Sequence, residues 1–328
     1  MEERFYRIIT HNDMDGVVSA ALCSYALKIK RVYFTSPSAV SRGIISINER
    51  DVVCDLPYPL VCGLWFDHHE GNLEELKLRG ISLEEIKGRF DLKPSCSRVV
   101  FEFFQEDGVS FPFYLEETVK ETDVVDGFLY SSIEDWRKET PGKLLDNSIK
   151  ASDSDLKEKQ AYLRYLVPLL RDHPLEEVVK DERVKKRIEK YKLEEEKMLR
   201  LIEQDAHFLP FDTEKELVVI DLSKHNRRPW VIKQLVSLIY PEALAVIEIF
   251  PVFEREIKTT NFGISMSLTV KAKNFVSKDI GEIMRQLNIG DGHKGAAGGF
   301  VKARSKLEML KKKEEVLKRI YELWKAQM

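Results

Sequence analysis

The most constraining feature of this sequence is the alternation, within its first seventy residues, of short apolar runs with helical patterns. Residues 4–10 are predicted to form a strand, and residues 16–29 a helix that is apolar nearly all round and hence buried on more than one side. Buried strands that alternate with helices are typical of a doubly wound, mostly parallel sheet. The first part of the chain is therefore predicted to be an α/β domain.

Further runs continue this pattern and extend the predicted sheet. Their composition predicts strands at residues 31–35, 43–47, 51–54 and 60–66, and helices at residues 73–78 and 96–105.

Polar motifs follow directly on three of the predicted strands. HNDMDG (residues 11–16) follows the first strand, Asp55 follows DVVC, and DHHEGN (residues 67–72) follows LVCGLWF. Ligands of such sheets bind at the carboxyl ends of the strands. We therefore expect the three motifs to converge on one crevice.

The remainder of the chain changes character twice. Residues 153–204 are highly charged, with apolar positions at helical spacing, and β patterns return after Pro210. Helices are predicted at residues 229–239 and 278–287, and a basic helix ends the sequence. We predict a catalytic domain at residues 1–150, a helical connector at 151–209 and a smaller α/β domain at 210–328.

Composition narrows the class of protein. The 55 acidic residues nearly balance the 52 lysines and arginines, so a polyanion site must be local rather than spread over the surface. The N-terminus lacks an apolar signal region and no segment approaches the ~20 apolar residues of a membrane span, which predicts a cytoplasmic protein. The four cysteines show no CxxC spacing, which favours buried thiols over zinc or disulfides.

The HNDMDG motif offers metal ligands at alternating positions. An extended backbone points His11, Asp13 and Asp15 to the same side, and imidazole with carboxylate suits Mn²⁺-like metals. The alternative is a surface turn whose aspartates cap the following helix. These six residues alone do not decide between the two.

The DHHEGN motif strengthens the metal interpretation. Asp67, His68 and His69 follow an apolar strand, and ETDVVDG adds Asp123 and Asp126. A carboxylate shared by two cations holds them ~3.5–4 Å apart, which suits phosphoryl transfer.

The motifs HNDMDG, Asp55, DHHEGN, ETDVVDG and GDGHKGAAGGF, in that order, resemble the DHH phosphoesterase family with a DHHA1-type C-terminal domain. The resemblance spans nearly the whole chain. The family includes RecJ-type exonucleases, nano-RNA and linear-dinucleotide phosphodiesterases, nucleotide phosphatases and exopolyphosphatase-like members. It implies two divalent ions, with Mn²⁺ expected and Mg²⁺ or Co²⁺ as alternatives.

The resemblance also implies roles for individual residues. Asp67 and His69 are expected to support catalysis, with His69 binding or protonating the leaving phosphate region, and Asp55 is expected to bridge the metals. We favour Asp123 over Asp126 because it falls nearer the end of the preceding helix. The expected metal ligands are His11, Asp13, Asp15, Asp55, His68 and Asp123.

The glycine-rich GDGHKGAAGGF segment suits a phosphate-gripping loop, because glycines let backbone N–H groups approach an anion. Family members usually read GGGH here, so Asp291 is a substitution. The alternative is a glycine-rich turn before a packed helix. Arg98 and two lysines near the segment are further candidates, although the lysines also fit a solvated face. The expected substrate-binding residues are Arg98, Lys271, Lys273, Gly290, Gly292, His293 and Lys294.

The resemblance predicts hydrolysis of a phosphate ester by metal-activated water. A short single-stranded RNA or DNA, or a linear dinucleotide, is the expected substrate, cleaved to mononucleotides. The oligomeric state stays open, with a homodimer as one option. Polyphosphate and phosphoadenosine phosphate are alternative substrates. A non-catalytic nucleotide-binding or nucleic-acid-binding scaffold is the alternative of another class, although such proteins usually lose ligands.

Overall fold

The structure is a computed structural model that describes residues 5–273, 277–292 and 294–327. Its contacts divide the chain into two compact units. The first comprises the described residues up to 129 together with residues 138–192, and the second comprises residues 130–137 together with those from 193 onward. Residues 151–192 are thus counted with the first unit.

The first unit is built on a five-stranded sheet in which every pair of neighbours is parallel, in the order β2-β1-β3-β4-β5. The predicted doubly wound α/β fold is confirmed. Its strands are β1 (Arg7–His11), β2 (Val32–Thr35), β3 (Asp51–Cys54), β4 (Leu64–Asp67) and β5 (Gly88–Phe90).

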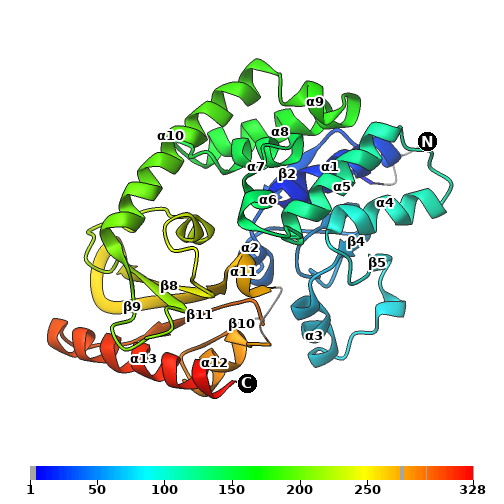
Figure 1. The fold of residues 1–328 in the computed structure, drawn as a ribbon. Coiled ribbons are helices and arrows are strands. Elements are labelled where there is room, and N and C mark those ends of the chain that lie inside the picture. The colour runs from blue at the N-terminus through cyan, green and yellow to red at the C-terminus, as the bar shows by residue number, and fades with distance from the viewer. Residues whose placement is uncertain (1–4, 274–276, 293, 328) are drawn as a thin grey trace. The chain divides into compact units, whose positions relative to one another are not determined.

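Helices enclose both faces of this sheet (Figure 1). Successive strand residues pack on opposite faces, as Ile8 and Ile9 do, because side chains alternate along a strand. On the larger face α1 (Met14–Leu27), α4 (Cys96–Glu106) and α8 (Leu156–Asp172) pack on the strands. In the same core, α5 (Phe113–Asp126), α7 (Pro141–Lys150) and α9 (Leu175–Val178) pack on other helices. The smaller face is covered by α2 (Pro37–Ser41) and α3 (Glu70–Leu78).

The predicted strand at residues 43–47 is wrong. Helix α2 ends just before Gly43, whose φ of +63° turns the chain, and the N–H of Ile44 donates back to the carbonyl of Ala39. The apolar residues of this run therefore belong to a helix end and a loop. A 3₁₀ turn, η1 (Leu83–Glu85), precedes β5.

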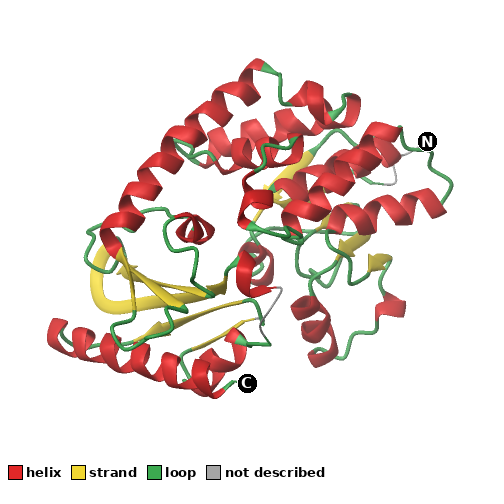
Figure 2. Cartoon of the chain, in the orientation of Figure 1, coloured by secondary structure: helices red, strands yellow, loops and turns green. Residues whose placement is uncertain are grey.

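The second unit contains a mixed six-stranded sheet in the order β10-β11-β9-β8-β7-β6. Only β7 and β8 are parallel. Figure 2 shows the long strands of this sheet beside the C-terminal helix. The strands are β6 (Ala206–Phe208), β7 (Leu217–Asp221), β8 (Ala245–Glu254), β9 (Ile257–Leu268), β10 (Gly290–Gly292) and β11 (Ala296–Val301).

One face of this second sheet is packed against helices. Ile283 and Trp324 lie in a core with Ile247 and Ile264 of the central strands. The helices of the unit are α6 (Ile133–Arg137), α11 (Val270–Lys273), α12 (Ile280–Gln286) and α13 (Lys306–Ala326), and α10 (Glu182–Asp205) continues into it from the first unit.

The predicted helix at residues 229–239 is only a 3₁₀ turn, η2 (Lys233–Leu238). This turn and the residues before it contact the sheet. Lys233 Nζ lies 3.2 Å from Ser265 Oγ, and Arg228 Nη2 lies 2.9 Å from Glu248 Oε1. These contacts with β8 and β9 hold the segment in an irregular path. Within the described part of the chain, no helix is long and apolar enough to cross a membrane.

Candidate metal centre

The first motif places His11 at the end of β1 and its two aspartates at the start of α1. Asp13 is the N-cap of this helix and accepts a hydrogen bond of 3.0 Å from the Gly16 N–H, so the capping alternative holds for this residue. His11 Nδ1 also lies 2.6 Å from Asp13 Oδ2. A Cβ at Gly16 would meet the His11 carbonyl oxygen at 2.2 Å, so only glycine allows this approach. The N-cap residue Asp13 and His11 are therefore held in contact with each other.

Asp15 points inward and links two elements. Its carboxylate accepts hydrogen bonds from the backbone N–H groups of Cys96 (2.6 Å) and Ser97 (2.8 Å), which begin α4. Those N–H groups have no partner within their own helix, so Asp15 satisfies them from outside. Asp15 is 1% exposed and cannot be a surface cap.

Asp55 occupies the centre of the cluster. It directly follows β3 with a left-handed φ of 56°, a conformation that aspartate tolerates better than most residues. One carboxylate oxygen lies 3.5 Å from His11 Nδ1, and the other lies 3.7 Å from both His68 Nε2 and His69 Nδ1. Three motifs therefore meet at this buried side chain.

His68 turns one ring nitrogen into the cluster. Its Nδ1 lies 3.0 Å from the Lys93 carbonyl oxygen, which can only accept, so Nδ1 carries the proton. In the neutral ring Nε2 then has a free lone pair. It lies 3.3 Å from Asp126 Oδ2 and 3.7 Å from Asp15 Oδ2. This backbone contact fixes the tautomer that a metal ligand needs.

Asp67 holds the second histidine of the motif. The fully buried Asp67 carboxylate lies 3.0 Å from His69 Nδ1 and accepts a 2.7 Å hydrogen bond from Asn72. Burial alone would lower the pKa of His69, but the hydrogen bond and charge of Asp67 raise it overall. His69 is thus kept able to carry a proton. Sequence reasoning did not single out Asn72, although it lies within the DHHEGN motif.

The two aspartates of ETDVVDG have different partners. Asp123 Oδ2 lies 2.6 Å from Arg98 Nη2, and Asp123 Oδ1 accepts a 2.7 Å hydrogen bond from Ser95. Asp126 instead reaches His68. The two residues lie three apart near the end of α5, so spacing alone could not separate them. We therefore propose Asp126, in place of Asp123, as the metal ligand from this helix.

The partners of Asp123 also bear on Arg98. In addition to the contact through Nη2, Arg98 Nε lies 2.9 Å from Asp123 Oδ2. The guanidinium is therefore neutralised by this carboxylate, and a phosphate would have to share the guanidinium with Asp123.

Three carboxylates of the cluster, those of Asp15, Asp55 and Asp126, lie where their ionised form is disfavoured. Burial and then the negative charges of Asp13 and Asp15 raise the pKa of Asp55 well above its usual range. The same causes, with Asp15 before Asp13, raise the pKa of Asp126 to about 9. Burial likewise raises the pKa of Asp15. Nearby cations would favour the ionised carboxylates and so remove the free-energy cost of holding these charges together out of water.

The cluster fits divalent metal ions. Asp55 Oδ2 and His68 Nε2 are buried and have no hydrogen-bond partner among the described residues, although both are strong acceptors. Oxygen and imidazole nitrogen donors together suit Mn²⁺ or Zn²⁺-like ions. Three sets of residues bring ligand atoms within 4.8 Å of one another: His11 with Asp13 and Asp55, Asp55 with His68 and His69, and Asp15 with His68 and Asp126.

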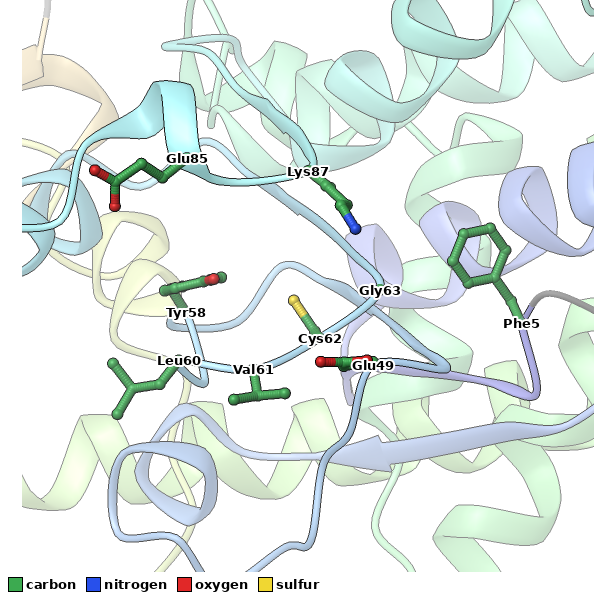
Figure 3. A pocket seen from close by; sticks show the side chains of 9 residues that line it. All are labelled: Phe5, Glu49, Tyr58, Leu60, Val61, Cys62, Gly63, Glu85 and Lys87. Carbon is green, nitrogen blue, oxygen red and sulfur yellow. The ribbon is translucent and has the colours of Figure 1, made fainter.

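A cavity at the opposite edge of the same sheet has different chemistry (Figure 3). It has a volume of about 290 Å³, and Phe5, Glu49, Gly63 and Lys87, which precede β1, β3, β4 and β5, line it. Its position at the amino ends of the strands separates it from the metal cluster. Parallel α/β sheets place their chemistry at the carboxyl ends, where the cluster lies.

The predicted gripping segment forms a hairpin rather than a loop. Gly290 and Gly292 lie in β10, which pairs with β11, and a Cβ at Gly290 would meet the Gly298 carbonyl oxygen at 2.0 Å. These two glycines therefore permit close strand pairing. Lys294 follows on an exposed turn, whereas His293 lies outside the described residues.

Asp291 does not present an isolated charge. Arg285 Nη1 lies 2.7 Å from its Oδ1, and the same nitrogen lies 3.3 Å from the Gly292 carbonyl oxygen. The carboxylate of Asp291 is thus paired with a guanidinium. Lys271 and Lys273 lie in α11, where Lys271 donates to the Glu242 carbonyl at 3.3 Å.

Together the fold and the cluster define an α/β protein with an acidic, histidine-containing centre at the carboxyl edge of its parallel sheet. No family model and no curated protein matches the sequence. Solved structures do match. A pGpG-specific phosphodiesterase from Vibrio cholerae has a TM-score of 0.74 at 22% identity, with 98% of this chain and 100% of that chain covered.

Two further structures share the fold more loosely. An exopolyphosphatase-related protein from Bacteroides fragilis has a TM-score of 0.53 at 12% identity, covering 99% of this chain and 94% of that one. An exonuclease RecJ bound to manganese has a TM-score of 0.52 at 14% identity, covering 96% and 90%. The resemblance to DHH phosphoesterases is therefore confirmed at the level of the fold, over both units.

Proposed function

We propose that this protein is a metal-dependent phosphoesterase that hydrolyses linear dinucleotides or short oligonucleotides to mononucleotides. The observation that carries the proposal is the cluster of Asp13, Asp15, Asp55 and Asp126 with His11 and His68. Two of its buried atoms have no hydrogen-bond partner among the described residues. A purely structural cluster of this charge would be destabilising, since like charges held out of water repel one another. Two divalent ions would balance it.

The proposed ligands divide into two sets around Asp55. His11 and Asp13 would hold one ion, and Asp15, His68 and Asp126 the other, with Asp55 between them. Mn²⁺ is the ion we expect, with Mg²⁺ or Co²⁺ as alternatives. The ions would activate water and neutralise charge on the phosphoryl oxygens.

The chain's own residues have supporting roles in this proposal. The Asp67–His69 pair orients an imidazole whose side chain is 47% exposed and therefore accessible to substrate. Because its pKa is raised, His69 can bind a phosphate oxygen or give a proton to a leaving group. Asp67 acts only through His69 and is a positioning residue.

Dinucleotides are the substrates we prefer, because of one structure that shares this fold. The structure that matches over 98% of this chain and all of its own length is described as specific for pGpG, a linear dinucleotide. Polyphosphate is the second candidate, since an exopolyphosphatase-related protein shares the fold over 99% of this chain. A cytoplasmic location and a homodimer stay predictions.

The test is hydrolysis of a substrate panel in Mn²⁺, comprising pGpG, pApA, a six-nucleotide RNA, phosphoadenosine phosphate and polyphosphate. Asp55→Asn serves as the inactive control, because asparagine also tolerates a left-handed φ. Mononucleotide release that Asp55→Asn abolishes supports the proposal. Release of orthophosphate from polyphosphate alone would favour the second candidate. No turnover by a folded, metal-loaded protein would favour a non-catalytic binding protein.

A further inference from the structure

The second unit contains a cavity with a strongly cationic wall. Its volume is about 390 Å³, within the range of about 300–1,000 Å³ that small-molecule sites occupy. Lys224, Lys258, Lys306 and Lys313 line it, and no carboxylate does so among the described residues. A hollow lined by one sign of charge focuses the electrostatic potential and concentrates ligands of the opposite sign.

Three elements at one end of the second sheet build this cavity. Lys306, Met309, Leu310 and Lys313 recur at the spacing of one face of α13. The start of β9 and the turn after β7 supply the other walls. The Thr260 hydroxyl donates to the Ala303 carbonyl and ties β9 to the segment that precedes α13. The site is therefore formed by packed secondary structure.

Two of the four lysines are already neutralised. Lys313 Nζ lies 2.6 Å from Asp221 Oδ2, and Lys224 pairs with Asp205. The other two are not. Lys258 Nζ donates to the His225 carbonyl at 2.8 Å, and neither Lys258 nor Lys306 forms an ion pair with any residue that the structure describes. The cavity thus retains positive charge.

The cavity also has an apolar part. Met309 is half-buried against the core of the unit, and Leu310 is 48% exposed. Thr259 adds a hydroxyl, which donates to the Val252 carbonyl at 3.0 Å, accepts from the Asn261 N–H at 3.2 Å and has one further lone pair. Cations beside an apolar surface suit a molecule that has an anionic group on a less polar body.

This cavity lies at the opposite end of β9 from the turn of the glycine-rich hairpin. Thr260 lies near the start of β9, whereas the hairpin strand β11 reaches Ser267 through Ala296. Seven residues of strand separate the two positions, or about 23 Å at ~3.3 Å per residue. A ligand in the cavity would therefore leave the turn of the hairpin uncovered.

We propose that this cavity binds a nucleotide, with its phosphate at Lys258 and Lys306 and its base on Met309 and Leu310. The site neither requires nor forms part of the phosphoesterase activity proposed above. The nucleotide can come from two sources, a free mononucleotide or the 5′-phosphorylated end of a single-stranded RNA. Both present the same phosphate and base.

Equilibrium dialysis of the full chain in EDTA, which removes divalent ions, tests the site. AMP, a 5′-phosphorylated eight-nucleotide RNA and inorganic phosphate are the probes. We expect the Lys258→Gln/Lys306→Gln variant to bind AMP or the RNA at least tenfold more weakly than the unaltered protein. If this variant loses binding of AMP, the site's ligand is a free nucleotide. If it loses binding of the RNA alone, the ligand is the 5′-phosphorylated end of an RNA.

The matched control is Lys311→Gln/Lys318→Gln, which removes the same charge from exposed positions of α13 outside the cavity. It should bind like the unaltered protein. Crosslinking with 8-azido-AMP and peptide mapping gives a readout on the unaltered protein, which should label the segments around residues 223–224 or 306–313. Equal weakening in both variants, labelling elsewhere, no binding of AMP or RNA, or phosphate binding as tightly as AMP would overturn the proposal.

Discussion

Asp123 Oδ2 lies 2.6 Å from the Arg98 guanidinium, while Asp126, one helical turn later, lies 3.3 Å from His68 Nε2. Two aspartates on one helix therefore serve different partners. Asp123 forms a charge pair beside the start of α4, and Asp126 lies with Asp15 and His68 in a set of residues that could hold a metal ion. This division leads to a direct comparison of two conservative variants.

Asp126→Asn should weaken Mn²⁺ binding at least tenfold, because the amide keeps the shape but loses the charge that the ion would attract. Asp123→Asn should leave Mn²⁺ affinity within about threefold, since Asp123 contacts Arg98 and Ser95. Isothermal titration with Mn²⁺ at pH 7.5 measures both. The reverse order of effects would restore Asp123 as the ligand.

The metal-free protein should lose stability as pH rises. The pKa of Asp126 is raised to about 9 in the folded state and is ~3.9 in an unfolded chain, so the unfolded state releases this proton first. Asp55 shifts in the same direction. Ionisation therefore favours unfolding progressively between about pH 4 and 9.

Thermal melts in EDTA between pH 5 and 8.5 measure this effect, and we expect a falling melting temperature. Mn²⁺ should reverse the trend, because its ligands bind as carboxylates and its affinity rises with pH. In EDTA, Asp55→Asn should melt at a higher temperature than the unaltered protein, yet gain little from Mn²⁺. A pH-independent melt in EDTA would contradict the electrostatic account.

Asp67→Asn should lower kcat roughly 10–100-fold, the usual effect of removing the residue that orients a functional histidine. It should also lower the pKa of His69, because the charge that raises it is gone. The pH profile of kcat separates this role from a structural one. His69→Gln should remove the part of the pH profile of kcat that the titration of His69 causes. An unchanged profile in both variants would exclude the proposed role of His69.

Gly16→Ala tests the local packing of the first motif. Alanine favours a helix interior over glycine by about 1 kcal/mol, so helix propensity predicts a gain in stability. The His11 carbonyl oxygen at 2.2 Å from the added Cβ predicts a loss instead, and we expect the loss to prevail by about 2 kcal/mol or more. Urea unfolding measures it. Gly295→Ala is the control, since nothing lies within 4 Å of its Cβ position.

The sequence predicted the parallel sheet and the convergence of its motifs because both depend on local pattern. Apolar runs that end in His11, Asp55 and Asp67 locate the carboxyl edge without knowledge of the tertiary structure. The choice between Asp123 and Asp126 depended on where Arg98 and His68 lie, which spacing along α5 does not encode. The hairpin at Gly290 was likewise hidden, because glycines fit both loops and close strand pairing.

Asp15 has two tasks, since it satisfies the first N–H groups of α4 and also faces His68. Loss of the partly exposed His11 would remove a proposed metal ligand and little of the buried core. Loss of Asp15 would leave two buried donors unpaired at the start of a central helix. A lineage that abandoned metal chemistry could therefore discard His11 readily, while selection for folding alone would still retain Asp15. In such an inactive descendant, a surviving Asp15 would be no sign of surviving catalysis.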